Sequence, residues 1–377
     1  MSKPRIDFLY LSEPDMIKAG VTDMTKCVDT MEEVLMLLSK GDYRMGGKNG
    51  NSHGVMMSFP EKPEFPGMPC DGPDKRFMAM PAYIGGSFQM AGMKWYGSNV
   101  ENRKDGIPRS ILMVALNEPD TGIPLAYMSG NLISSYRTGA IPGVGTKLFA
   151  KPDSKVCGFF GPGVMSRTAL AAFAATCPNL DTVKIKGRGQ ASIDSFVSFV
   201  KEKYPQFKTI QVVDNVEELV KDSDVLCFAS TSDDNPSTYP LVKEEWIKPG
   251  AVITCPSAVN FEDDFLINKA RLVVDNKKLY EAWADEYPYP TFGTVNIVGS
   301  KFTDLVHDGK LDWDNVDNIG DVVSGVKPGR TSDDEIIVYS VGGMPVEDVA
   351  WGKIIYENAK KLGIGTLLNL WETPELA

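Results

Sequence analysis

Two patterns of apolar and polar positions divide this chain. Between about residues 76 and 132, apolar side chains fall in short runs separated by turn residues, which predicts antiparallel strands. These runs are FMAMPAYI, QMAGMKWYG, SILMVALN and PLAYMSG. From about residue 150, apolar strands alternate with helical stretches, which predicts βαβ units and a parallel sheet. The strands expected there are KVCGFF (155–160), TVKIK (182–186), TIQVV (209–213), DVLCFA (224–229), AVITC (251–255) and RLVVD (271–275).

Helices are expected near both ends of the chain. From Met24, apolar residues recur on one helical face as far as Gly41. A second helix is expected to begin near Pro345 and to end at Gly363. Residues 45–75 are rich in Gly, Pro, Asn and Met without a clear period, which predicts a long loop.

Composition narrows the class of protein. The chain has 377 residues, enough for two domains, and its net charge of −11 argues against a nucleic-acid or anionic-membrane partner. It shows neither an apolar signal core nor a membrane-spanning stretch, and none of its six cysteines forms a CxxC pair. We therefore expect a cytoplasmic protein with reduced thiols. The two histidines, His53 and His307, lie far apart, so neither a His-based metal site nor a Ser-His-Asp triad is expected. The acidic pairs Glu244-Glu245 and Asp333-Asp334 are adjacent in the chain, as is typical of solvated loop charges, so no other metal site is expected either.

A glycine-rich turn follows the first strand of the βαβ region. The residues from Gly161 to Ser166 read GPGVMS, which fits the pattern GxGxxS. The pattern alone is weak, but here a strand precedes it and a helix follows it, as a dinucleotide site requires. Gly161 permits the tight turn, Gly163 lets the backbone approach a pyrophosphate, and the helix N-terminus offers N–H groups to the phosphates. The alternative is a glycine-rich turn without a ligand.

The end of the second strand bears on the choice of cofactor. An NAD-specific fold usually carries an acidic residue there, which binds the ribose 2′-hydroxyl. Here Lys186, Gly187 and Arg188 occupy this position, and Arg188 is able to meet a 2′-phosphate. We therefore expect NADP(H) to be favoured, with NAD(H) as the alternative. These basic residues could also be ordinary solvated loop residues.

Three basic residues precede the βαβ region: Arg44, Lys94 and Arg137. Lys94 lies inside an apolar strand, where a charged group requires a partner. Arginine and lysine together form a natural clamp for a substrate carboxylate. Each of the three alone is more often a surface or ion-paired residue.

At this point the sequence resembles the ornithine cyclodeaminase/mu-crystallin family, and within it the amino-acid and opine-type dehydrogenases. The resemblance extends over several separate blocks in the right order. They are Met80-Pro81 followed by GMKW, Asn117-Glu118-Pro119-Asp120-Thr121-Gly122, ISSYRTGA, GPGVMSRTAL, Lys327-Pro328-Gly329-Arg330-Thr331-Ser332-Asp333, and Gly343 with Glu347-Asp348-Val349.

The resemblance implies an α/β fold: a Rossmann domain over residues 135–322, and an α+β substrate-binding and dimerisation domain over residues 1–134 plus 323–377. It also implies a homodimer. Its carboxylate-binding positions match Arg44, Lys94 and Arg137. The cofactor-binding residues would be Thr138, Gly161, Gly163, Val164, Met165, Gly187, Arg188, Ser230, Thr231 and Gly343.

Two departures from the family pattern bear on the reaction. Cyclodeaminases carry a Glu where this chain has Met78, and a catalytic Asp where it has Asn260, although Glu262 to Asp264 follow closely. We therefore expect an NAD(P)-dependent amino-acid dehydrogenase or imine reductase, acting on an amino acid or on a keto acid plus an amine. Lys94 or water would donate the proton, with polarisation of the imine as an alternative role for Lys94, and Asn260 would orient the substrate nitrogen. The alternatives are a cyclodeaminase with recycled NAD and an NADPH- and ligand-binding protein with little turnover.

Overall fold

The computed structural model describes residues 5–231 and 235–376 and divides the chain into two compact units. Unit 1 comprises Met1–Asp23, Gly41–Tyr136 and Met344–Ala377, and unit 2 comprises Met24–Lys40 and Arg137–Gly343. The α/β class expected from the sequence is confirmed, since one unit contains a mainly antiparallel sheet and the other a parallel one.

Unit 1 is built on an eight-stranded sheet in the order β18-β1-β7-β6-β5-β4-β2, with β3 also paired to β4. Its strands are β1 (Ile6–Leu11), β2 (Tyr43–Met45), β3 (Val55–Ser58), β4 (Arg76–Ile84), β5 (Met90–Ser98), β6 (Ser110–Asn117), β7 (Pro124–Ser129) and β18 (Thr366–Trp371). The four strands from β4 to β7 pair antiparallel, as predicted.

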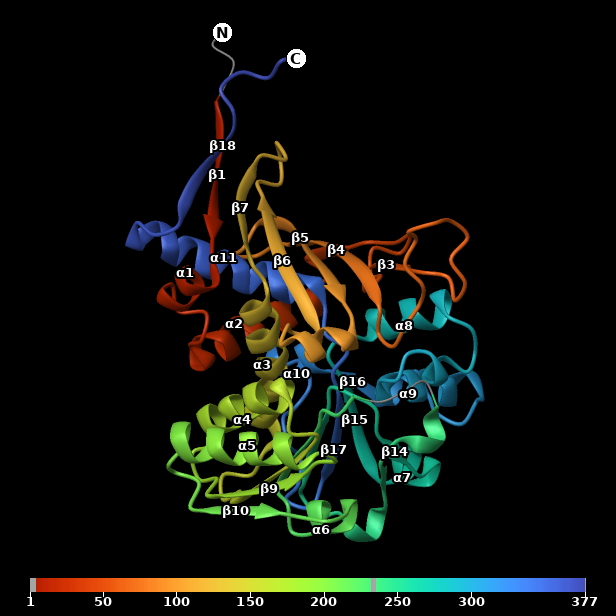
Figure 1. Ribbon diagram of the computed structural model, residues 1–377. Coiled ribbons are helices and arrows are strands. Elements are labelled where there is room, and N and C mark those ends of the chain that lie inside the picture. Colours follow the sequence, from red (N-terminus) through yellow and green to blue (C-terminus); the bar gives the residue numbers. More distant parts are fainter. Residues whose placement is uncertain (1–4, 232–234, 377) are drawn as a thin grey trace. The chain divides into compact units, whose positions relative to one another are not determined.

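The two faces of this sheet have different surroundings. Helix α11 (Pro345–Leu362) runs across one face of β4, β5 and β6 (Figure 1). Because strand side chains alternate, Met80, Lys94 and Val114 are in register and share the buried face. A short helix, α1 (Glu13–Lys18), also belongs to unit 1 and begins with a capping box between Ser12 and Asp15.

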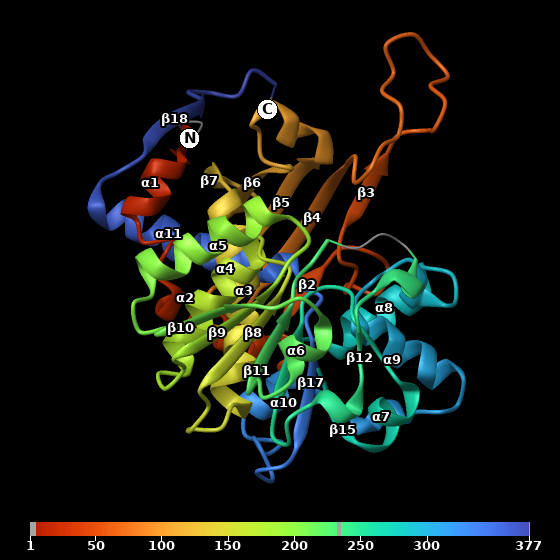
Figure 2. The ribbon, with the colours of Figure 1, turned by 60° about the horizontal axis from the view of Figure 1, so that its bottom comes forward.

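Residues 45–75 correct the expectation of an unbroken loop. Strand β3 lies within this segment and pairs antiparallel with β4, with Val55 opposite Ala79 and Ser58 opposite Arg76. All four residues of β3 are exposed, so burial leaves no alternating pattern in the sequence. The chain after β3 then forms a long loop (Figure 2).

Unit 2 contains a parallel sheet in the order β10-β9-β8-β11-β13-β17-β15-β16. Its strands are β8 (Val156–Phe160), β9 (Thr182–Lys186), β10 (Thr209–Val212), β11 (Val225–Phe228), β13 (Val252–Cys255), β15 (Ala270–Val274), β16 (Val316–Asn318) and β17 (Ile336–Ser340). The first five strands follow the 3-2-1-4-5 order of dinucleotide-binding folds, in which ligands bind where the order reverses. Here the reversal lies between β8 and β11 (Figure 2).

Most helices of unit 2 lie between these strands in the chain, whereas α2 and α3 precede the first of them, β8. The helices are α2 (Met24–Lys40), α3 (Asn131–Phe149, which begins in unit 1), α4 (Val164–Thr176), α5 (Gln190–Lys203), α6 (Val216–Val220), α7 (Asp263–Asn268), α8 (Lys277–Glu286), α9 (Val298–His307) and α10 (Ile319–Val323). A two-stranded sheet is formed by β12 (Leu241–Val242) and β14 (Asn260–Phe261). Residues 323–343 lie in unit 2 because β17 pairs between β13 and β15.

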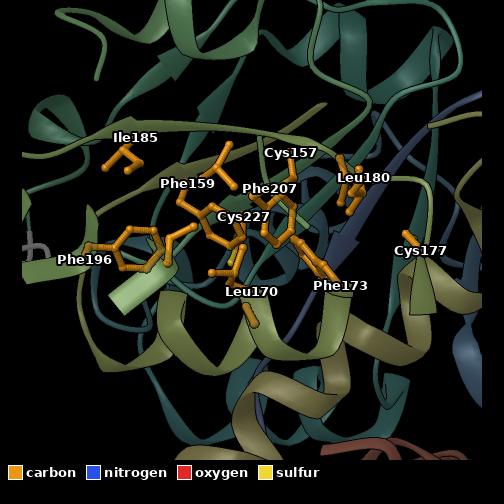
Figure 3. Close-up of a cluster of buried hydrophobic side chains, with 14 of the residues drawn as sticks. Cys157, Phe159, Leu170, Phe173, Cys177, Leu180, Ile185, Phe196, Phe207 and Cys227 are labelled. Atoms are coloured by element: carbon orange, nitrogen blue, oxygen red, sulfur yellow. The ribbon is translucent and has the colours of Figure 1, made fainter. Parts of the chain in front are cut away.

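An aromatic core holds α4 and α5 against this parallel sheet. Phe159 on β8 packs against Phe173 of α4 and Phe196 of α5, with ring centroids 5.5 and 5.6 Å apart (Figure 3). Apolar burial of this size fixes where α4 begins relative to the end of β8. The core therefore positions the glycine-rich turn between them.

Candidate active site

The glycine-rich turn takes a conformation that only glycine accommodates well. Gly161 has φ +90°, and a Cβ atom there would lie 2.6 Å from the Cα of Ser230. Its N–H donates to the carbonyl of Lys186 at 2.8 Å. The turn at the end of β8 is thereby held against the chain that follows β11 and the last residue of β9.

Gly163 leaves open space at the start of α4. It is the N-cap residue, no side chain caps this helix end, and a Cβ atom there would meet nothing within 4 Å. The next residue, Val164, is 59% exposed. The Ser166 hydroxyl donates to the Gly161 carbonyl at 2.6 Å and stiffens the turn. Uncapped N–H groups beside open space fit a phosphate-bearing cofactor.

The other predicted cofactor residues of this region lie on the neighbouring strand ends. The Arg188 guanidinium, after β9, donates to the carbonyl of Thr231, after β11, at 2.9 Å. A Cβ atom on Gly187 would lie 2.9 Å from Pro162, so the strand ends meet closely. Met165 differs from them, because its side chain packs against the aromatic core.

A hollow of about 320 Å³ lies beside the turn, between the first turns of α4 and α5. It is lined by Pro162, Gly163, Val164, Arg167, Ala191, Ser192 and Ser195. Arg167 donates to the Ser195 hydroxyl at 2.8 Å and lies over the ring of Phe199, and burial lowers the pKa of its guanidinium. The hollow therefore places one cation beside the uncapped start of α4.

Arg137 and Gly343 lie together elsewhere in unit 2. Gly343 has φ +73°, and a Cβ atom there would lie 2.5 Å from the Arg137 guanidinium. The Asp275 carboxylate accepts the N–H groups of Gly342 and Gly343, both at 2.8 Å, and burial raises the pKa of Asp275. Thr138 follows Arg137 in α3 and is half-buried. Arg137 thus packs against the Gly342–Gly343 backbone, whose N–H groups are hydrogen-bonded to the buried Asp275 carboxylate.

Asn260, the first residue of β14, bonds to the chain segment before β12. Its side-chain amide donates to the Pro236 carbonyl at 2.6 Å, and its backbone N–H donates to Pro240 at 2.8 Å. The acidic residues after it include Asp263, which pairs with Lys301 at 2.9 Å. Ser230 also has a hydrogen-bond partner, because its backbone carbonyl accepts a hydrogen bond from the Ser257 hydroxyl.

The two other basic candidates belong to unit 1 and differ in burial. Lys94 is 3% exposed, and its ammonium group forms an ion pair with the fully buried Asp348 carboxylate at 3.0 Å. Arg44 is exposed on β2, and its guanidinium donates to the carbonyls of Gly41 and Tyr43 at 3.2 and 2.5 Å. Of the predicted carboxylate ligands, unit 1 therefore contains Arg44 and Lys94, and unit 2 contains Arg137.

Asp348 is a residue that sequence reasoning did not assign to the site. The available signal was an acidic pair, Glu347 and Asp348, among the apolar residues at the start of the predicted helix. Its partner Lys94 lies 254 positions earlier in the chain, so the pairing itself has no local signature.

Some kinds of site are not found in the described part of the chain. No three His, Cys, Asp or Glu side chains cluster there closely enough to hold a metal ion. No helix formed by the described residues has the length and apolarity to cross a membrane. All six cysteines are described and are free thiols, five of them buried.

Comparisons with known proteins show extensive similarity. A family model described as the ornithine cyclodeaminase/mu-crystallin family matches residues 20–363. An N-((2S)-2-amino-2-carboxyethyl)-L-glutamate dehydrogenase from Staphylococcus aureus is 28% identical and covers 97% of this chain and 99% of the relative. An alanine dehydrogenase from Archaeoglobus fulgidus is 31% identical, over 78% of this chain and 83% of the relative.

A solved structure matches nearly the full length of this chain. The Thermococcus litoralis Delta(1)-pyrroline-2-carboxylate reductase in complex with NADH and L-proline matches with a TM-score of 0.75 and 26% identity. The match covers 95% of this chain and 99% of that one. An archaeal alanine dehydrogenase dimer with bound NAD also has a TM-score of 0.75, with 25% identity over 97% of this chain and 100% of that one.

Proposed function

The chain belongs to the ornithine cyclodeaminase/mu-crystallin family, and from this premise we propose that it is an NAD(P)-dependent amino-acid dehydrogenase or imine reductase. The observation that carries the proposal is the uncapped turn from Gly161 to Gly163, at the point where the order of the parallel strands reverses. The relatives named dehydrogenase or reductase support the same reaction class.

On the cofactor side, the backbone of the turn would bind the pyrophosphate at the start of α4. When bound, the dinucleotide supplies or accepts a hydride at its nicotinamide ring. Chain segments at Thr138, Ser230, Thr231 and Gly343 would line the cofactor. In this proposal unit 2 is the cofactor-binding domain and unit 1 is the substrate and dimerisation domain.

On the substrate side, Arg44, Lys94 and Arg137 would bind the carboxylate of an amino acid or imino acid. In the reductive direction the α-carbon of the imine gains a hydride, and the imine nitrogen gains one proton. Lys94 would donate that proton, as an ammonium group in an apolar setting is suited to do. Asn260 would orient the substrate nitrogen through its side-chain oxygen, because its amide nitrogen donates to Pro236.

We also propose a preference for NADP(H) over NAD(H). No acidic residue directly follows β9, and Arg188 would meet the 2′-phosphate there. The Arg188 guanidinium contacts a backbone carbonyl in this structure, which leaves it near the strand ends. The six free thiols support a reducing, cytoplasmic setting for such an enzyme.

A homodimer is proposed through the outer face of the unit 1 sheet. Apolar side chains are exposed there: Val55 (66%), Met57 (50%), Trp95 (36%) and Ile111 (54%). Strand register places all four on the face opposite Lys94. Apolar patches of this kind mark interfaces. We expect light scattering to give a dimer mass for the native protein and a monomer mass for Trp95→Glu; a dimeric Trp95→Glu would place the interface elsewhere.

The proposed reaction is tested by mixing the protein with NADPH and a panel of imino acids, or of 2-oxo acids with amines. We expect absorbance at 340 nm to fall as the cofactor is oxidised. Ammonia release from a diamino acid without any absorbance change would instead indicate a cyclodeaminase. Cofactor binding with no turnover across the panel would indicate a binding protein.

A further inference from the structure

We propose that Asp348 is a positioning residue that fixes the ammonium group of Lys94 for the transfer of the proton to the substrate nitrogen. The inference rests on the proposed function, because Lys94 matters in this way only if the protein turns over an imino or amino acid. It assigns a role to a residue that does not itself touch the substrate.

The pair is built from two rigid elements of unit 1. Lys94 lies in the middle of β5, in register with Met80 of β4 and Val114 of β6. Asp348 lies in the first turn of α11, which packs across the same strands. The distance from Nζ of Lys94 to Oδ2 of Asp348 is 3.0 Å. A flexible four-carbon side chain is therefore anchored at its tip by a helix.

Burial makes this contact more costly to break than a surface ion pair. The side chain of Lys94 is 4% exposed and that of Asp348 is 0% exposed. Removing one member of a buried pair leaves an uncompensated charge, so the pair holds its geometry. The start of α11 adds a favourable term, because the N-terminus of a helix stabilises a carboxylate.

A fixed ammonium group is what proton transfer requires. An ammonium group carries three N–H donors, and one of them points at Asp348. That contact limits both the position of Nζ and the directions of its other N–H bonds. Loss of the anchor would leave Lys94 in place but misaligned, and small misplacements of a catalytic group cost about 100-fold in rate. The ring of Tyr96 also lies near this charge, with its centroid 5.8 Å from Nζ.

The direct test is Asp348→Asn, which keeps the shape of the side chain and removes its charge. We expect kcat for imine reduction to fall by about 10- to 100-fold while the Kd for NADPH stays within a factor of two. The matched control is Asp224→Asn. Asp224 is also a buried carboxylate paired with a lysine, Lys248 at 2.5 Å. It lies in unit 2, and neither Asp224 nor Lys248 is among the proposed binding residues. This control should lower Tm and leave kcat unchanged.

A second variant covers the case in which Asp348→Asn does not fold. Lys94→Arg keeps the positive charge and the ion pair but moves the donor groups, so we expect Tm to change little and kcat to fall at least tenfold. A folded Asp348→Asn or Lys94→Arg variant with the kcat of the native protein would overturn the proposal that Asp348 positions the Lys94 ammonium group. A wild-type protein that turns over nothing in the panel would instead overturn the proposed function, and the two failures are therefore distinguishable.

Discussion

Replacing Gly163 by alanine puts one methyl group where we propose that the cofactor pyrophosphate meets the backbone. The residue has φ −97° and ψ −164°, which any amino acid adopts, and its Cβ direction is open. The substitution therefore strains neither the backbone nor the packing. It adds bulk only toward the space in which the phosphates would lie.

The expected effects on folding and on binding differ in size. Alanine is a poorer N-cap than glycine by about 1 kcal/mol or less, which corresponds to a fall in Tm of about 2 to 4 °C or less in a unit of this size. A methyl group that pushes the pyrophosphate away from the N–H groups of α4 would weaken hydrogen bonds to a charged group, each contributing about 1.5–3 kcal/mol. We therefore expect the Kd for the dinucleotide to rise by about 10- to 100-fold.

The assay is a titration of NADPH fluorescence beside a thermal melt of the same sample. Gly293→Ala is the matched control, because Gly293 also has open space at its Cβ position but belongs to no proposed site. It should bind NADPH as the native protein does. A folded Gly163→Ala variant with native affinity would refute the assignment of the pyrophosphate to this turn.

Three further predictions address the other parts of the account. Lys94→Met should abolish turnover while the Kd for NADPH stays unchanged in the titration, and intact turnover would remove Lys94 from the catalytic group. Arg188→Ser should raise the Kd for NADPH about tenfold and leave that for NADH unaltered; an equal effect on both would mean that Arg188 does not meet the 2′-phosphate. Burial raises the pKa of Asp224, but hydrogen bonds from Lys248 and from the amides of Val156 and Lys155 outweigh it, so the folded-state pKa lies below the usual value. The stability that Asp224 contributes is therefore present above its unfolded-state pKa and is lost as the pH falls through the folded-state pKa. In thermal melts at decreasing pH, Asp224→Asn should lose less Tm than the native protein does. The same dependence of Tm on pH in both proteins would contradict the shift.

Much of the fold follows from local sequence patterns. The strands from β8 to β11 and the helices α4 and α5 were predictable because burial repeats at strand and helix periods. The turn at Gly161 was predictable for the same reason, since strand, glycines and helix are consecutive in the chain. Strand β3 was not, because its four residues are exposed and its register depends on pairing with β4, about 20 residues later.

The candidate site depends more on long-range contacts. The burial of Lys94 among apolar strand residues indicated that it needs a partner, yet the partner is Asp348, 254 positions away. The hydrogen bond from Asn260 to the Pro236 carbonyl was not predictable from the sequence either, because its acceptor lies in a turn 24 positions earlier. Residue type and spacing therefore pointed to candidate groups, while their partners required the three-dimensional structure.

The most direct test of the central claim follows the hydride itself. The protein is incubated with an imino acid and NADPH that carries deuterium at C4 of the nicotinamide, in both stereoisomeric forms, and the product is analysed by mass spectrometry. The account predicts that one of the two forms delivers a single deuterium to the α-carbon of the amino acid product. Product without deuterium from either form, or ammonia release with the label retained in the cofactor, would contradict it.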